Sequence, residues 1–256
     1  MRRHMGHVLT TAGAVAGASL LTVGLAGPGA ASAATSSVRS QAPVIYTTSQ
    51  AGFVTGGGRW FRYIGATVVV PPVPAKAGNA GYAELVLGGA GVTPASLGVK
   101  AGGGAASIGW NAVGGLFGMG GGAMAGISPN PGDVLALSIY YDRAGHDSFT
   151  ATDYTQGVSQ TVTVPSAAGV VYTAAEAAGV VSNATVSAPA ASIRLWSFTG
   201  GHVTTYSGTR GTLTGPWTTT MVVDTTTGTA AGHLVTSPGP LWNSGQNFGV
   251  WLRPTA

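Results

Sequence analysis

Carboxylates are scarce in this sequence, and its two glutamates are where water-activating chemistry would begin. The 256-residue chain holds seven Asp and Glu residues in total, and Glu84 and Glu176 are its only glutamates. Glu176 has alanine neighbours rather than Lys or Arg, so it is either a general base in a cleft or an exposed carboxylate in a turn. Glu84 begins an apolar run and could pair with Lys100 from the following strand.

The two glutamates could also act together. Two carboxyl groups that flank a sugar linkage at a suitable separation can cleave glycosides. The sequence does not fix the distance between Glu84 and Glu176, so this alternative stays open beside peptide hydrolysis.

Several other chemistries lack the residues that they need. The absence of Cys excludes a thiolate nucleophile, a disulfide framework and any Cys-based zinc site. Neither a Gly-x-Ser-x-Gly elbow nor a Gly-Lys-Ser/Thr phosphate loop occurs. His146 and Asp147 fall in an expected hairpin turn, and His202 and His233 are isolated. We therefore expect no metal and no cofactor.

The elements that position these residues are predicted to be strands. Only 7% of residues are charged, too few to cover the outer faces of a helical protein, and 43 are Gly. Residues 134–141 alternate apolar and polar side chains, and 142–147 reads as the turn of a hairpin. Similar runs occur at 61–70, 83–87, 148–155, 159–164, 192–198, 202–206, 218–223, 232–236 and 248–252. This pattern predicts a single-domain, all-β fold, an antiparallel β-sandwich.

Two stretches depart from the strand pattern. Residues 172–181 could form a helical turn. Residues 101–126 hold 11 Gly and are expected to be a flexible or tightly turned connection, or else a flap over a cleft.

The amino terminus reads as a secretory signal. Arg2 and Arg3 precede the uncharged run 8–25, and Ala31-Ser32-Ala33 offers a cleavage site. We expect a signal peptide over 1–33, a flexible arm over 34–50 and one domain over 51–256. The product would be secreted, extracellular and monomeric, with no membrane association after cleavage. Its bases are scattered, so we expect no nucleic-acid partner.

Several short segments in order carry a resemblance to a known family. They are Ala51-Gly52-Phe53-Val54, the strand that ends in Val70-Pro71, the segment 128–133, Ala175-Glu176 and the segment 193–198. Together they resemble the G1 family of glutamic peptidases, the eqolisins, and they cover most of the domain. The resemblance implies an eqolisin-like, concanavalin-like sandwich of two curved sheets with an active site on the concave face. It identifies the chain as a divergent, bacterial-type member with an incomplete catalytic motif.

The resemblance also implies a role for Glu176. Members hydrolyse peptide bonds with a Glu that activates water and a Gln that stabilises the oxyanion. Glu176 occupies the position of that Glu, with Ala177 in place of a Trp. The stretch that matches the family's Gln, 95–100, contains no Gln. A Gln from another strand, such as Gln50 or Gln160, could reach Glu176, and the sequence leaves this open.

These observations predict a secreted relative of the glutamic peptidases. A substrate-type cleft would bind peptide or another extended polymer through Glu84, Trp110 and Trp196, with weak or no turnover by Glu176. One alternative is an active acid endopeptidase that uses Glu176 with a relocated amide. Another is a carbohydrate-binding or structural cell-surface sandwich.

Overall fold

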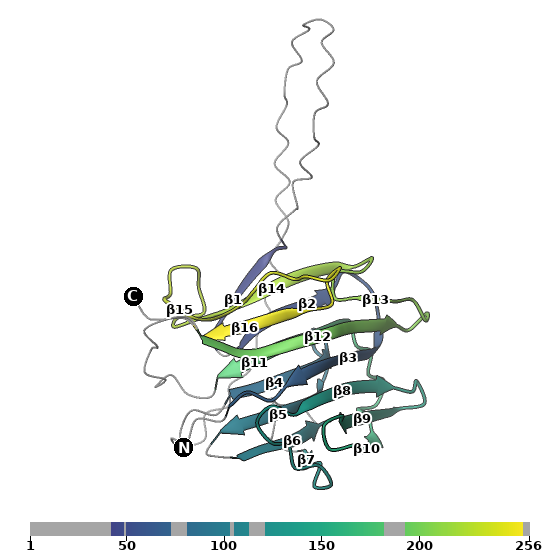
Figure 1. Ribbon diagram of the computed structural model, residues 1–256. Coiled ribbons are helices and arrows are strands. Elements are labelled where there is room, and N and C mark those ends of the chain that lie inside the picture. Colours follow the sequence, from purple (N-terminus) through teal and green to yellow (C-terminus); the bar gives the residue numbers. More distant parts are fainter. Residues whose placement is uncertain are drawn as a thin grey trace, which may run out of the picture. The chain divides into compact units, whose positions relative to one another are not determined.

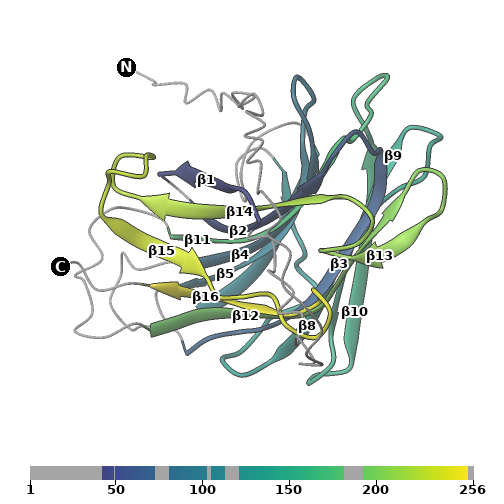
Figure 2. The same ribbon diagram turned by 90° about the horizontal axis from the view of Figure 1, so that it is seen from above.

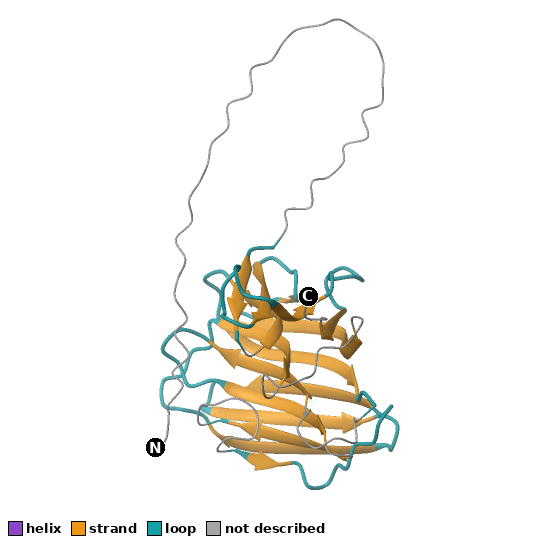
Figure 3. Ribbon diagram, turned by 90° about the vertical axis from the view of Figure 1, so that its left-hand side faces the viewer, coloured by secondary structure: helices purple, strands orange, loops and turns teal. Residues whose placement is uncertain are grey.

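The folded part of the chain consists of strands and loops. The computed structural model describes residues 42–48, 50–72, 81–102, 105–112, 121–181 and 193–252. The predicted signal peptide, 1–33, lies outside the described residues. Every regular element within them is a strand, as Figure 3 shows. None of the described residues forms a helix long and apolar enough to cross a membrane.

The strands form one continuous, open sheet. Its order is β10-β9-β8-β3-β12-β16-β15-β14-β2-β11-β4-β5-β6-β7, and β1 and β13 pair with β14 and β12 at its sides. All pairs are antiparallel except β1 with β14. The bounds are β1 Val44–Thr47, β2 Gln50–Gly56, β3 Phe61–Val69, β4 Gly81–Gly88, β5 Ala95–Gly102, β6 Ala105–Asn111, β7 Gly122–Ala123, β8 Val134–Tyr141, β9 His146–Asp153, β10 Val158–Pro165, β11 Ala174–Val181, β12 Ile193–Thr205, β13 Arg210–Thr212, β14 Thr218–Thr225, β15 Leu234–Pro238 and β16 Phe248–Leu252.

The sheet folds over at β15, so its two halves lie face to face as two layers (Figures 1 and 2). We call β14, β2, β11, β4, β5, β6 and β7 the first layer, and β16, β12, β3, β8, β9 and β10 the second layer. Alternate side chains of each layer fill the space between them. Leu85 and Leu97 from the first layer and Ile64, Leu137 and Phe198 from the second are buried in one core cluster. This arrangement confirms the predicted all-β sandwich.

The sequence pattern predicted several strands correctly and missed others, among them β11. The alternating run 134–141 is β8, and its neighbour after the turn is β9. The expectation of a helical turn over 172–181 was wrong, because that segment contains the strand β11. Ala175 and Ala177 are fully buried in the core, while β11 pairs with β2 on one side and β4 on the other. Small side chains suit a central strand that is covered from the other layer.

The Gly-rich segment and the expected arm also contain strands. Within 101–126, β6 and β7 extend the first layer, while 103–104 and 113–120 lie outside the described residues. Within 34–50, which we expected to be a flexible arm, β1 pairs with β14 and Gln50 is the first residue of β2. The described end of that arm therefore belongs to the sheet.

Candidate functional site

Glu176 lies at the centre of the first layer and points away from the core. In β11, Ala175 and Ala177 pack into the core, so alternation places Glu176 on the opposite side of the layer. Gln50, at the start of β2, shares that side, because Ala51 is buried in the core. The side-chain amide Nε2 of Gln50 donates a hydrogen bond of 2.6 Å to Oε1 of Glu176. We call this surface of the first layer the Glu176 face.

Small residues make this contact possible. Gln50 lies opposite Val180 and Glu176 lies opposite Val54, so the two side chains meet diagonally across two strands. The opposed pair between them is Gly52 and Ala178. A Cβ on Gly52 would come within 2.6 Å of Cα and 2.9 Å of Cβ of Ala178. The absence of a side chain at Gly52 lets the strands approach and leaves room for the amide above them.

Glu84 places a second carboxylate beside Glu176. It lies in β4 opposite Ala178, on the Glu176 face, with 1% of its surface exposed. Residues in this diagonal relation on neighbouring strands have Cβ atoms roughly 7–8 Å apart, within reach of long side chains. Burial, followed by the negative charge of Glu84, raises the pKa of Glu176 to about 8, and the hydrogen bond from Gln50 opposes that rise. Glu176 is thus a much stronger base than an ordinary carboxylate, although part of its surface is accessible.

The register aligns small residues across the Glu176 face. Successive partners on β2, β11, β4, β5 and β6 form one row in which only Glu84 has a long side chain: Gly52, Ala178, Glu84, Gly98 and Gly109. A neighbouring row of paired residues starts at Glu176 in β11 and continues through Val86 in β4. It ends in two polar side chains, Ser96 in β5 and Asn111 in β6. Ser96 and Asn111 are buried, and the Ser96 hydroxyl has no hydrogen-bond partner within the described segments.

Lys100 is also on the Glu176 face, but the residue opposite it is Tyr82 and not Glu84. Its Nζ is 5.7 Å from the centre of the Tyr82 ring. The ion pair expected between Glu84 and Lys100 stays a prediction.

The two tryptophans expected to contact substrate lie on the core side of the sheet. Trp196 is 1% exposed and packs against Gly81, so its ring presents no surface to a ligand. Trp110 alternates with Gly109 and Asn111, which share the face of Glu84, and its ring stacks on Phe149 of the other layer at 5.3 Å. Strand alternation turns both rings inward, and Trp196 is fully enclosed whereas Trp110 is half-buried, so a ligand contact of Trp110 stays a prediction.

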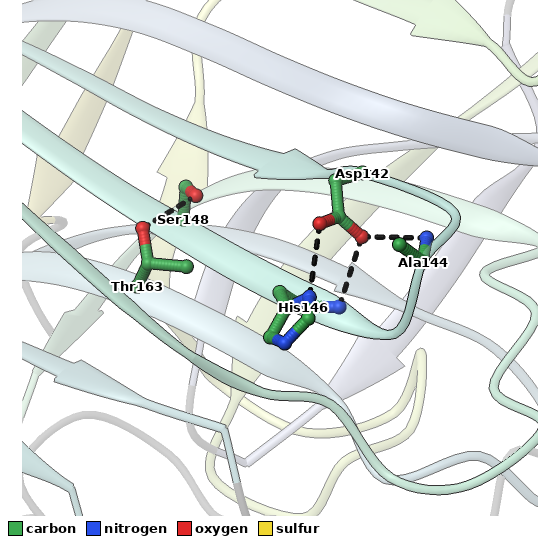
Figure 4. Close-up of polar contacts among 5 residues, drawn as sticks. All are labelled: Asp142, Ala144, His146, Ser148 and Thr163. Atoms are coloured by element: carbon green, nitrogen blue, oxygen red, sulfur yellow. Dashed lines mark hydrogen bonds and ion pairs between the residues drawn. The ribbon is translucent and has the colours of Figure 1, made fainter.

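The predicted hairpin turn lies at 142–145, and His146 and Asp147, which were expected within it, are the first residues of β9. The Asp142 carboxylate accepts hydrogen bonds from the backbone N–H groups of Ala144 and His146 at 2.7 and 3.0 Å, and it contacts Nδ1 of His146 at 3.0 Å (Figure 4). Those backbone donors, that of His146 first, hold the pKa of Asp142 below its usual value. Asp147 is buried and accepts a hydrogen bond from Tyr172. These residues close a turn and fix a strand rather than form a site.

The described segments contain no three-residue metal-ligand cluster, and the amide that bonds to Glu176 is that of Gln50. No group of three His, Asp or Glu side chains is placed there to hold a metal ion. Gln160, the other glutamine considered, accepts a hydrogen bond from the backbone of Gly126. Of the two glutamines that the sequence named, Gln50 is the one whose amide bonds to Glu176. The sequence could not choose between Gln50 and Gln160, because the strand register alone brings Gln50 to Glu176.

Comparison with known proteins assigns the chain to a known fold. No family model matches the chain, and no curated protein matches it. Among solved structures it is similar to scytalido-glutamic peptidase with a transition state analog inhibitor, with a TM-score of 0.61 and 16% identity over 80% of this chain and 98% of that chain. The chain has the fold of a glutamic peptidase. SCP-B, a member of the eqolisin family solved in a complex with the tripeptide Ala-Ile-His, matches over the same shares with 16% identity and a TM-score of 0.57.

Proposed function

We propose that this protein hydrolyses peptide bonds, with Glu176 as the general base and Gln50 as the donor to the oxyanion. The observation that carries the proposal is the 2.6 Å contact between the Gln50 amide and the Glu176 carboxylate, in a glutamic-peptidase fold. Hydrolysis of an unactivated amide needs a base for water and a donor for the negative charge that develops on the carbonyl oxygen. This pair offers both groups on one face of one sheet.

Glu176 performs the proton transfers. In its ionised form it takes a proton from a water molecule, whose oxygen then forms a bond to the carbonyl carbon of the substrate. The protonated Glu176 returns that proton to the leaving nitrogen as the C–N bond breaks, which yields a carboxylic acid and an amine. The raised pKa of Glu176, about 8, makes it a stronger base for the first transfer and a usable acid for the second near neutral pH.

Gln50 supplies the donor. A side-chain amide has two N–H bonds, and one of them is directed at Glu176. The other is available for the substrate oxygen, where a preorganised donor stabilises the tetrahedral intermediate. The contact with Glu176 also orients the amide, so little reorganisation is needed during the reaction.

The proposed substrate is an extended chain outside the cell. The row Gly52, Ala178, Gly98 and Gly109 carries only small residues beside Glu84, and the proposal places a polymer that crosses the strands along this row. Hydrolysis of secreted or environmental peptides agrees with the secretory signal expected over 1–33. In this proposal the chain is a divergent relative of the eqolisins whose amide comes from β2 instead of β5.

The test is peptide hydrolysis by purified protein from pH 4 to pH 9. Wild type is expected to release fragments with new amino termini from a denatured protein, and Glu176→Gln is expected to release none. A folded wild-type protein that cleaves no peptide at any pH would overturn the proposal.

The second candidate is a peptide-binding protein without turnover. It is favoured by the lack of any amide in 95–100, the stretch in which the resemblance places the catalytic Gln. Peptide binding that is equal in wild type and in Glu176→Gln, without cleavage by either, would select this candidate.

A further inference from the structure

The outer surface of the second layer carries a separate cavity. Its volume is about 260 Å³, and β9, β8, β3 and β12 contribute its walls. The side chains that the argument needs are Tyr63, Ser138, Thr150, Thr152, Tyr154 and His202. Their neighbours in sequence, such as Ile64, Ile139, Ala151 and Val203, are buried in the core. The cavity therefore opens on the side of the second layer that faces away from the core and from the first layer.

We propose that this cavity binds a neutral saccharide. Sugars present hydroxyl groups that both donate and accept, together with C–H faces that pack on aromatic rings. The cavity offers the same two kinds of group, serine and threonine hydroxyls beside two tyrosine rings, and its lining contains no Asp, Glu, Lys or Arg. A charged ligand would lose its hydration there without gaining a counter-charge in the lining.

Tyr63 is held in position for such a role. Its ring lies over Gly65, because a Cβ on Gly65 would be 2.9 Å from Cζ and 3.0 Å from Cε1 of Tyr63. The ring also packs against the imidazole of His202, with ring centres 5.0 Å apart. Burial raises the pKa of Tyr63, and its hydrogen bond with Ser138 opposes that rise. The phenol therefore stays neutral and can donate to a ligand.

Thr150 and Thr152, on another wall of the cavity, are held in position by hydrogen bonds to residues outside it. The hydroxyls of Thr150 and Thr152 bond to Thr161 and Ser159 of β10 at 2.9 and 2.8 Å. A hydroxyl has one donor and two acceptor positions, so each of these groups keeps capacity for a further bond. Tyr154, directly after β9, is 64% exposed and supplies an accessible ring at the rim.

The test is titration of the intact protein with three neutral trisaccharides: cellotriose, maltotriose and the β-1,4 trimer of N-acetylglucosamine. Amide chemical shifts are followed by NMR. At least one sugar is expected to shift the amides of Tyr63, Ser138 and His202 with a dissociation constant on the order of 1 mM. Tyr154→Ala and Gly65→Ala are each expected to weaken that binding tenfold or more. Thr163→Ala, which removes a hydroxyl outside the cavity, should leave binding unchanged, and thermal unfolding verifies that each variant is folded.

Three outcomes would overturn the proposal. One is the absence of shifts with all three sugars at about 10 mM. Another is binding that is unchanged in both Tyr154→Ala and Gly65→Ala. The third is binding that disappears in Glu176→Gln, because the sugar would then occupy the Glu176 face. Loss of peptidase activity in Glu176→Gln with unchanged sugar binding separates this inference from the proposed function.

Discussion

Gln50 and Glu176 are 126 positions apart in the sequence, yet the amide of one donates to the carboxylate of the other at 2.6 Å. They belong to neighbouring strands, but the register does not place them opposite each other. Both side chains reach along their strands across Gly52 and Ala178 to meet. The contact is therefore specific to this amide and this carboxylate, and Gly52 is part of what permits it.

Removal of the Gln50 amide should slow the reaction more than it weakens substrate binding. Gln50→Ala is expected to lower kcat for peptide cleavage by about 10²–10³-fold, the usual effect of losing one oxyanion donor. KM should change little, because the donor acts chiefly in the transition state. Steady-state kinetics with a fluorogenic peptide measures both constants.

Gln160→Ala is the matched control for Gln50→Ala. Gln160 is a strand glutamine that bonds to Gly126, so its removal should leave kcat unchanged. Equal kcat values for wild type and Gln50→Ala would assign the oxyanion to another donor.

Neutralisation of Glu84 should shift the pH dependence of the reaction. The charge of Glu84 helps to raise the pKa of Glu176 to about 8, so wild-type activity should increase with pH up to about that value. In Glu84→Gln the pKa of Glu176 falls, and the acidic limb of the profile should move to lower pH, while burial keeps the pKa above the ordinary value. A profile of kcat/KM against pH for both proteins measures the shift. Superimposable profiles would show that Glu84 does not set the basicity of Glu176.

The sequence predicted the fold better than it predicted the site. Alternation over 134–141 is strict because β8 has one face in the core and one in solvent, which is the condition under which period-two patterns appear. β11 lacks such a pattern because two of its outward residues, Ala174 and Ala178, are as small as its inward ones, and a run of alanines also suits a helix.

The site depended on information that no local pattern contains. Glu176 stood out because carboxylates are rare in this chain and its surroundings resemble a known motif. Gln50 follows a polar stretch without any motif, and only the pairing of β2 with β11 brings it to Glu176. The two tryptophans were chosen by residue type without strand parity, which directs both rings to the core side and encloses Trp196.

Gly52→Ala should damage both stability and activity. The added methyl group would press on the carbonyl oxygen of Ala177 and on Ala178, which are parts of the neighbouring strand and cannot turn aside. Overpacking of this kind costs about 1–3 kcal/mol of unfolding free energy. Separation of β2 from β11 would also draw Gln50 away from Glu176, so kcat should fall as in Gln50→Ala.

Gly56→Ala is the control for Gly52→Ala, since it makes the same change in the same strand. A Cβ there would have only the carbonyl oxygen of Thr173 nearby, at 3.7 Å. Denaturant unfolding of the two variants should therefore separate them clearly. A Gly52→Ala protein as stable and as active as Gly56→Ala would contradict the proposed role of Gly52.

Glu176 should make the folded protein less stable as the pH rises from about 4.5 to about 8. Its pKa is higher in the folded chain than the ordinary value of 4.5, so the folded state binds more protons than the unfolded state in that range. Glu176→Gln removes this contribution of Glu176 to the pH dependence of the unfolding free energy. Relative to wild type, the variant should gain about 1–2 kcal/mol of unfolding free energy between pH 5 and pH 8, a reduced value because part of the side chain is in water.

The comparison with wild type isolates Glu176 from the other carboxyl groups. Burial also raises the pKa of Asp224 to about 6, but this contribution is common to both proteins and cancels in the difference. Denaturant unfolding at a series of pH values gives the two curves. If they run parallel from pH 5 to pH 8, Glu176 titrates at its ordinary pKa, and it is then neither the strong base nor the proton donor that amide hydrolysis at this site requires.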